Sequence, residues 1–267
     1  METNSINLPT QTKDSELAYF VFDELERTQP SIQDYPPSLY SILDSNGSFS
    51  SPSLVIGLCN DGLPFTLNLD NPKSGSILIV GDRRKDIAQL MKVIGHSVSL
   101  INHPQEVSFY VITSKPNDYF ELLSYTHCQE ILSAEDRSAG GLINDLASIA
   151  AQRRISGEGG SKTILFIDDL SSISNLLNDF RVYLNFQSLI QRGPKSGIWP
   201  IVSSTKHDVE HAKPHLARMF RTKIFDKYNS TLSASPAFNE LSDQETLEFR
   251  FNVIIKGRLI PIDNLTI

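Results

Sequence analysis

Residues 77–86 are Ile-Leu-Ile-Val-Gly-Asp-Arg-Arg-Lys-Asp, and this stretch decides the fold class. Four apolar residues followed by glycine are typical of a fully buried strand, and the apolar periodicity that begins at Ile87 predicts a helix directly afterwards. A buried strand that leads through a short polar loop into a helix is the first unit of a sheet with helical crossovers. Residues 77–86 therefore predict an α/β protein.

Outward from this stretch, apolar segments of strand length alternate with segments of helical periodicity. Strands are predicted at residues 107–112, 163–167, 198–203 and 224–225, and helices at residues 86–100, 119–125, 134–155 and 171–191. This alternation implies right-handed crossovers and a mainly parallel sheet. Such a sheet binds ligands beyond the carboxyl ends of its strands, so the residues after Val80, Ile167 and Ser203 are the candidates for chemistry.

Antiparallel pairs are predicted at both ends of the alternating region. Residues 54–59 and 65–69 enclose an Asn-Asp-Gly sequence, which is a strong hairpin turn signal. Residues 247–255 and 258–262 are two apolar segments separated by a Lys-Gly turn, and they are predicted to form a closing antiparallel hairpin.

Residues 1–53 differ in composition from the rest of the chain. The first thirteen residues are polar, apolar residues then recur at helical spacing between Leu17 and Leu25, and residues 31–53 are rich in Ser, Pro, Asn and Asp. We expect residues 1–53 to be an extension, partly disordered, with one or two short helices, and residues 54–267 to form the main domain. An N-terminal helix packed on the core is the alternative.

The overall composition is that of a globular protein. Of 267 residues, 40% are hydrophobic and 21% charged, which argues against a disordered chain or a coiled coil. Lys and Arg number 24 against 31 Asp and Glu, a net charge of −7, whereas a whole-surface nucleic-acid binder is more often basic. Two cysteines fit a reducing compartment. No apolar stretch has membrane-spanning length, so we expect a cytoplasmic protein.

The loop after Val80 has part of the chemistry of a phosphate-binding loop. The full motif is Gly-x-x-x-x-Gly-Lys-Ser/Thr, whose backbone wraps the phosphates and whose hydroxyl binds magnesium. Here three residues separate Gly81 from Lys85, the second glycine is missing, and Asp86 replaces the hydroxyl residue. Arg83, Arg84, Lys85 and a helix N-terminus can still form an anion site. A tight strand-to-helix connection with solvated charges is the alternative.

The segment 163–169, Thr-Ile-Leu-Phe-Ile-Asp-Asp, has the pattern of a Walker B strand. In such a strand the first carboxylate, here Asp168, holds Mg²⁺ through water, and the second, here Asp169, orients or polarises the attacking water. Many buried strands end in Asp, so the alternative is that Asp168 caps the helix that follows.

The segment 191–206 contains a basic, glycine-rich turn and then a strand that ends in hydroxyl residues and a lysine. In a nucleotide-hydrolysing sheet, this neighbouring strand end senses the outer phosphate, which makes Thr205 and Lys206 sensor candidates. A second glycine-rich stretch, residues 157–163, superficially matches a phosphate-binding loop. It precedes a strand instead of following one, so we predict a flexible loop there.

A rival motif belongs to another class of protein. Residues 207–211, His-Asp-Val-Glu-His, match the H-x-x-E-H pattern of inverted zinc peptidases. On a helix, His207 and His211 would share a face, but Pro214 is predicted to end that helix before His215, and zinc needs a third protein ligand. A solvated helix or loop is the alternative to a zinc site.

Taken together, these segments resemble the FtsK/HerA family of RecA-like P-loop ATPases, the motors of DNA translocation, conjugation and some secretion systems. The resemblance covers residues 54–267. It rests on the strand at 77–81, the Walker B-like segment, and the segment 193–206, which matches position by position at Gly197 and Ile198. Lys223 stands where the family carries a basic residue before an I-x-F strand.

The resemblance implies a three-layer α/β fold with a mainly parallel sheet and a C-terminal antiparallel hairpin. It also implies ATP and Mg²⁺ as ligands, with the 81–86 loop binding nucleotide, Asp168 and Asp169 in catalysis, and Thr205, Lys206 and Lys223 in sensing. Family members form hexameric rings, so the resemblance implies a homo-oligomer or a mixed ring with an active paralogue.

Departures from the family pattern decide the functional hypothesis. The loop lacks its second glycine and its Ser or Thr, Asp169 replaces the usual Glu, and Thr205-Lys206 replaces the sensor glutamine. Replacing Glu by the shorter Asp moves the carboxylate by about one C–C bond, and a misplacement of that size lowers the rate of catalysis roughly a hundredfold. We therefore predict a degenerate (pseudo-)ATPase that binds protein partners or copies of itself. A weak Mg-dependent ATPase of a DNA- or protein-translocating machine is the alternative, with DNA disfavoured by the acidic charge.

Overall fold

The computed structural model describes residues 37–47, 49, 51–157, 159–226, 251–255, 258–263 and 265–267. These residues belong to one compact unit that spans residues 35–267. The helix predicted between Leu17 and Leu25 lies outside the described residues. None of the helices in the described part combines the length and the apolar character that a membrane crossing requires.

The described strands form a single mixed sheet in the order β2-β1-β10-β9-β8-β3-β7-β6-β4-β5. The strands β8, β3, β7, β6, β4 and β5 run parallel, whereas β9, β10, β1 and β2 add antiparallel neighbours on one side. The predicted fold class is therefore confirmed. The strands are β1 (Ser53–Cys59), β2 (Pro64–Asn68), β3 (Ile77–Val80), β4 (Val107–Thr113), β5 (Cys128–Ser133), β6 (Lys162–Asp168), β7 (Ile198–Ser204), β8 (Thr222–Asp226), β9 (Phe251–Ile255) and β10 (Arg258–Asp263).

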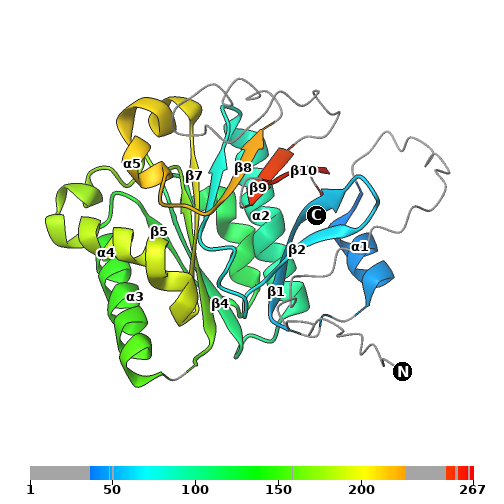
Figure 1. The fold of residues 1–267 in the computed structure, drawn as a ribbon, viewed down its shortest axis with the longest axis horizontal. Helices are drawn as coiled ribbons and strands as arrows, with labels where there is room; N and C mark the ends of the chain where they lie inside the picture. The colour runs from blue at the N-terminus through cyan, green and yellow to red at the C-terminus, as the bar shows by residue number, and fades with distance from the viewer. Residues whose placement is uncertain are drawn as a thin grey trace, which may run out of the picture. The chain divides into compact units, whose positions relative to one another are not determined.

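Helices cover both faces of this sheet and make a three-layer arrangement (Figure 1). The helix α2 and the 3₁₀ helix η1 pack on one face, and α3 and α4 pack on the other. The helical elements are α1 (Leu39–Asn46), α2 (Arg84–Ile101), η1 (Pro116–Ser124), α3 (Arg137–Ser156), η2 (Leu176–Asn178), α4 (Phe180–Arg192), η3 (Gly193–Ser196), η4 (Asp208–Ala212) and α5 (Pro214–Ala217).

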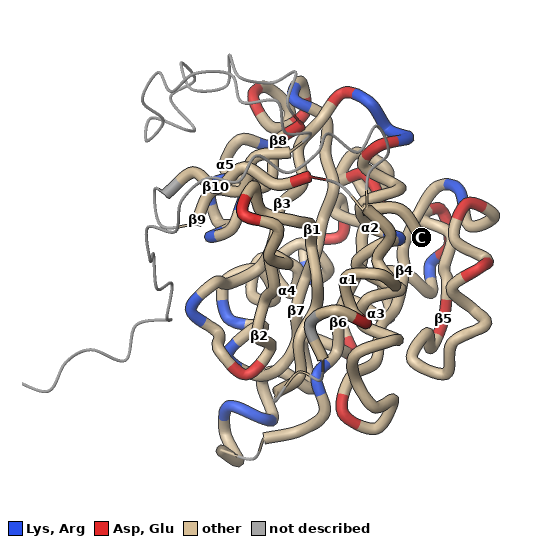
Figure 2. Tube along the Cα trace, turned by 90° about the vertical axis from the view of Figure 1, so that its right-hand side faces the viewer, with Lys and Arg blue, Asp and Glu red and all other residues tan. Residues whose placement is uncertain are grey.

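Successive side chains of a strand point to opposite faces of the sheet, so each buried strand contributes to an apolar core on both faces. On β6, Ile164 and Phe166 point towards α2, whereas Leu165 and Ile167 point towards α3 and α4. All seven residues of β7 are buried, as expected for a central parallel strand. In Figure 2 the tube along β7 is uniformly tan, because none of its residues is charged.

The short helix α1 packs on the main sheet. Leu39 and Ile42 are buried against Val55 of β1 and Val93 of α2. The backbone N–H of Leu39 donates to the carbonyl of Thr266 over 2.7 Å. The apolar run near residue 39 thus forms a small core of its own with β1, α2 and Leu265.

The sequence analysis differs from the structure at one predicted helix and at one strand that it did not predict. The helix predicted at 171–191 begins only at Phe180, because the Asp179 side chain caps it by accepting from the N–H groups of Arg181 and Val182. The preceding residues form turns and η2. The sequence analysis also missed β5, whose half-exposed edge position leaves it without a continuous apolar run.

Gly193 is expected to be a sensitive position. It has an ordinary helical φ of −51°, but a Cβ there would meet the carbonyl oxygen of Ile198 at 2.6 Å. We expect Gly193→Ala to lower the free energy of unfolding by about 1–2 kcal/mol. The matched control is Gly141→Ala in α3, where nothing lies within 4 Å of the added Cβ. Helix propensity should stabilise that variant by about 0.4–1 kcal/mol. Equal effects in urea unfolding would contradict the steric argument.

Candidate functional site

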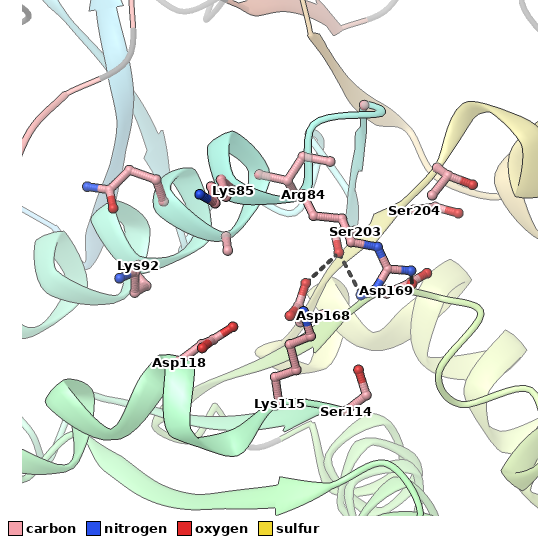
Figure 3. A pocket seen from close by; sticks show the side chains of 15 residues that line it. Arg84, Lys85, Lys92, Ser114, Lys115, Asp118, Asp168, Asp169, Ser203 and Ser204 are labelled. Atoms are coloured by element: carbon pink, nitrogen blue, oxygen red, sulfur yellow. Dashed lines mark hydrogen bonds and ion pairs between the residues drawn. The ribbon is translucent and has the colours of Figure 1, made fainter.

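A pocket of about 400 Å³ lies where β3, β6 and β7 end and α2 begins (Figure 3). The first turns of α2 form one wall, and the loop between β4 and η1 forms the opposite wall. This is the edge that the parallel-sheet rule indicated. The lining residues are Gly81, Arg84, Lys85, Ile87, Ala88, Gln89, Lys92, Ser114, Lys115, Asp118, Asp168, Asp169, Ser203, Ser204 and Thr205.

The predicted site residues divide into two groups. Six of them line the pocket: Gly81, Arg84, Lys85, Asp168, Asp169 and Thr205. The other four, Arg83, Asp86, Lys206 and Lys223, are not among the lining residues. Lys223 lies within β8, in register with Leu78 of β3.

Arg83 faces away from the lining residues, towards β8. Its guanidinium lies 2.7 Å from the Asp86 carboxylate and 3.4 Å from the carboxylate of Asp226 at the end of β8. Asp226 is buried, so this contact supplies a counter-ion for an otherwise costly charge. Arg83 therefore forms ion pairs with both Asp86 and Asp226 beside the pocket.

The connection from β3 to α2 is very short. Only Asp82 and Arg83 separate Gly81 from Arg84, where α2 begins. The N–H of Gly81 donates to the carbonyl of Ser204 over 3.2 Å, and a Cβ at Gly81 would meet the Ile87 side chain at 3.1 Å. The backbone at this point already has a partner, and the space next to it is filled.

Asp168 ends β6 and is held by two hydroxyl groups. Thr113 of β4 donates to one carboxylate oxygen over 3.1 Å, and Ser203 of β7 donates to the other over 3.1 Å. Burial raises the pKa of Asp168, and the adjacent Asp169 raises it further, although the hydroxyl hydrogen bonds oppose this shift. The sequence alternative that Asp168 caps the next helix is wrong, because Asp179 caps α4.

Asp169 has an unusual backbone. Its φ of +73° is the only positive value at a non-glycine position among the described residues. Its N–H donates to the Ser203 hydroxyl over 2.6 Å, and its carboxylate accepts from the N–H of Ser171. The same carboxylate is paired with the Arg84 guanidinium at 2.5 Å (Figure 3). This ion pair joins the end of β6 to the start of α2.

Solved structures resemble this architecture, although the sequence matches no protein-family model and no curated protein. EccC from Thermomonospora curvata (ATPases 2 and 3, with a signal sequence peptide) is 15% identical with a TM-score of 0.63, over 88% of this chain and 44% of that chain. The cytoplasmic domain of EssC is 18% identical with a TM-score of 0.64, over 89% and 47%. The pCW3 conjugation coupling protein TcpA is 17% identical with a TM-score of 0.64, over 88% and 70%.

The chain has the fold of RecA-like P-loop ATPases. EccC, EssC and TcpA have FtsK/HerA-like ATPase domains, so the resemblance drawn from the sequence is confirmed at the level of the fold. The chain spans less than half the length of the EccC and EssC chains that it matches.

Within this fold, the sequence analysis missed several polar residues at or beside the pocket. Gln89 and Lys92 of α2 line it, and so do Ser114, Lys115 and Asp118, which follow β4. Thr113, the last residue of β4, contacts the Walker B-like Asp168. Parallel sheets bind ligands beyond the carboxyl ends of their strands, and this rule applies to β4 as well as to β3, β6 and β7. Applied to β4, it would have identified the residues that follow that strand.

The histidine motif lies apart from the lining residues of the pocket. The His207 and His211 rings are 5.2 Å apart on a short π-helical turn, and both side chains are exposed. His215 instead contacts the Tyr183 hydroxyl over 2.7 Å. Among the described residues, no group of three or more His, Cys, Asp or Glu side chains could hold a metal ion.

Asp168 should make stability depend on pH. Its folded-state pKa lies above the ordinary value of 3.8. The folded chain therefore binds more protons than the unfolded chain in the window between these two values, and stability falls as the pH rises through it. We expect Asp168→Asn to remove this loss and to stabilise the fold by on the order of 1 kcal/mol at pH 7. The gain should vanish below about pH 4.

The measurement is urea unfolding between pH 4 and pH 7. Asp118→Asn is the matched control, because Asp118 is an exposed carboxylate on the same pocket. Its stability should follow the parent across the whole range. A destabilised Asp168→Asn variant at pH 7 would mean that the hydroxyl contacts outweigh burial of the charge.

Proposed function

We propose that this chain is a degenerate ATPase domain of the FtsK/HerA type. It acts as a binding or assembly subunit of an oligomeric complex, and its hydrolysis of ATP is impaired or absent. The observation that carries the proposal is the two-residue connection between Gly81 and Arg84. A nucleotide-binding loop needs several free N–H groups that wrap the phosphates, and a connection of this length does not supply them.

The ion pair between Arg84 and Asp169 supports the proposal. The Walker B-like pattern assigns Asp169 to the position at which an active ATPase orients the attacking water, and its carboxylate is bound by the Arg84 guanidinium and by the Ser171 N–H. A carboxylate that already accepts two strong hydrogen bonds is a poor general base.

Mg²⁺ fits the described residues poorly. Asp168 would be its protein contact, but both carboxylate oxygens already accept from hydroxyls, and burial raises the pKa of Asp168. The Ser or Thr that normally binds the metal is replaced by Asp86, which is paired with Arg83. One observation favours the alternative function, a weak Mg-dependent ATPase: Lys85 and Asp168 are both present and line the same pocket.

The assembly role is proposed from the relatives. One EccC structure is described as the cytoplasmic domain of a Type VII secretion ATPase, another is described in complex with a signal sequence peptide, and TcpA is described as a conjugation coupling protein. We propose that this chain works in the cytoplasm in such a machine and binds protein partners or copies of itself in a ring. A net charge of −7 disfavours DNA as the main partner.

Phosphate release from ATP with Mg²⁺ tests the proposal. We expect the full chain to release phosphate no faster than its Asp168→Ala and Lys85→Ala variants. The matched control is Lys195→Ala, because Lys195 is exposed on η3 and does not line the pocket. Turnover that is abolished by Asp168→Ala and kept by Lys195→Ala would establish the weak ATPase instead. Sedimentation of the full chain at micromolar concentrations tests self-assembly separately.

A further inference from the structure

We infer that the edge of the sheet opposite the pocket binds an acidic segment of a protein partner. The surface lies at the amino ends of the parallel strands, whereas the pocket lies at their carboxyl ends. We call it the basic edge, and its exposed residues are Lys73, Arg154, Ile155, Arg192 and Arg221. The inference rests on the proposed function, because it names the class of partner that a binding or assembly subunit takes.

Hydrogen bonds near the starts of β3 and β8 bring three of these residues together. The Ser76 hydroxyl donates to the carbonyl of Ile190, near the end of α4, over 2.9 Å. The Thr222 hydroxyl, at the start of β8, donates to the carbonyl of Ser74 over 2.7 Å. Three exposed basic residues lie within two positions of these contacts along the chain: Lys73, Arg192 and Arg221.

The end of α3 joins the same edge. The Arg153 guanidinium donates to the carbonyl of Ser196 in η3 over 3.0 Å, and η3 begins directly after Arg192. The two residues of α3 that follow, Arg154 and Ile155, are exposed. Ile155 is 88% exposed, more than any other large hydrophobic residue in the described part of the chain. It adds one apolar contact point to a surface whose other exposed side chains are cations.

The positive charge of the basic edge is not neutralised by neighbouring carboxylates. Within the described residues, none of its four basic side chains forms an ion pair. Asp70, three residues before Lys73, is bound by Lys162 at 2.8 Å. Glu106 precedes β4, which lies three strands from β3 or about 14 Å across the sheet, beyond the screening length of about 8 Å. The basic edge is therefore complementary to carboxylates from another molecule.

Helix dipoles account for only part of this charge. Arg154 and Arg192 lie in the last turns of α3 and α4, where cations stabilise the negative end of the dipole. Lys73 and Arg221 lie in the loops that precede β3 and β8, so no helix end explains them. The edge is thus more basic than its helices require, although the whole chain has a net charge of −7.

Three properties favour an acidic protein segment over nucleic acid as the partner. The net charge of −7 opposes the approach of a polyanionic duplex. Ile155 offers a contact that an apolar side chain of a peptide can use and that a sugar-phosphate backbone cannot. Three of the four cations are arginines, whose planar guanidinium binds a carboxylate through two parallel hydrogen bonds. The partner segment therefore carries Asp or Glu with interspersed apolar residues.

Fluorescence anisotropy of a labelled peptide with the full chain tests the inference. The probe is a synthetic peptide of repeated Glu-Glu-Leu units, and the control peptide has Gln in place of every Glu. We expect a dissociation constant on the order of 100 µM or tighter for the probe at low salt, and binding of the control at least about tenfold weaker. Added salt should weaken binding of the probe, because the ionic contacts are exposed.

Variants of the chain locate the binding surface. Arg192→Glu and Arg221→Glu should each weaken binding of the probe by about threefold to tenfold. The matched control is Arg181→Glu, which makes the same charge change at an exposed position at the opposite end of α4 and should bind like the parent. Arg192→Lys should retain most of the affinity. Ile155→Ser should weaken binding by about threefold, since it removes the apolar contact.

Four results would overturn the inference: no binding of the probe up to about 2 mM, equal affinity for the Gln peptide, equal weakening by Arg181→Glu and Arg192→Glu, or tighter binding of duplex DNA that Ile155→Ser leaves unchanged. The last result would make the basic edge a nucleic-acid interface. Turnover of ATP would contradict the proposed function without changing the affinity for the peptide, because the pocket lies at the opposite edge. Absence of both peptide binding and turnover would contradict this inference alone.

Discussion

Phe166→Ala is expected to lower the free energy of unfolding by about 3–5 kcal/mol. Phe166 lies in β6, is 1% exposed, and packs edge-to-face on Phe109 of β4 at a centroid distance of 5.7 Å. Removing the ring leaves a cavity between the sheet and α2 and also removes the aromatic contact. Because domains have only about 5–15 kcal/mol of stability, the variant should be close to unfolding at 37 °C.

Urea unfolding followed by circular dichroism measures this effect. Phe166→Leu is the matched control, since it keeps most of the buried volume, and it should lose clearly less stability. A loss below about 1 kcal/mol for the alanine variant would contradict the close packing on that face of the sheet.

Arg84→Glu is expected to lower stability by roughly 2–3 kcal/mol. It removes the cation that pairs with Asp169 and puts a like charge next to a carboxylate that is only 7% exposed. Asp169 is also held at a φ of +73°, so the ion pair is one of the contacts that keep an unfavourable backbone in place. The loss stays below that of a fully buried pair because the Arg84 side chain is 56% exposed and partly screened.

A double-mutant cycle of Arg84→Ala and Asp169→Asn isolates the pair. Asn tolerates a positive φ, so the second change removes the charge and keeps the backbone. We expect a coupling free energy of about 1–2 kcal/mol. The matched control replaces Lys85 instead of Arg84, because Lys85 is the next residue of α2 and forms no ion pair with the described residues. Equal coupling in both cycles would mean a general field effect and not a specific pair.

The sequence was sufficient for the fold because its signals are local. The apolar run at 77–80, the Asn-Asp-Gly turn and the strand that ends at Asp168 each follow from periodicity or turn chemistry. The secondary-structure prediction failed for elements whose local sequence signal is weak. The edge strand β5 is half exposed, and the start of α4 depends on whether Asp179 caps it.

The candidate site was predicted less completely, because it depends on distances that the sequence does not contain. Asp168 and Lys85, both named from the sequence, line one pocket, but the pairing of Arg84 with Asp169 needs two elements 85 residues apart to meet. The positive φ of Asp169 has no signal in the sequence, since glycine would be the usual residue there. Lys115 has no motif and was found only through the topology.

The order of strands in the sheet has a consequence for how the chain folds. The first hairpin, β1 and β2, adjoins the parallel half only through β10 and β9, and Leu58 of β1 is in register with Asp263 of β10. Such a pairing joins segments about two hundred residues apart and is among the slowest to form, because a very long loop must close first. During synthesis the inner edge of the hairpin therefore stays unpaired until β9 and β10 have left the ribosome. Pairing of β10 with β1 then covers an edge that could otherwise pair with another chain and aggregate.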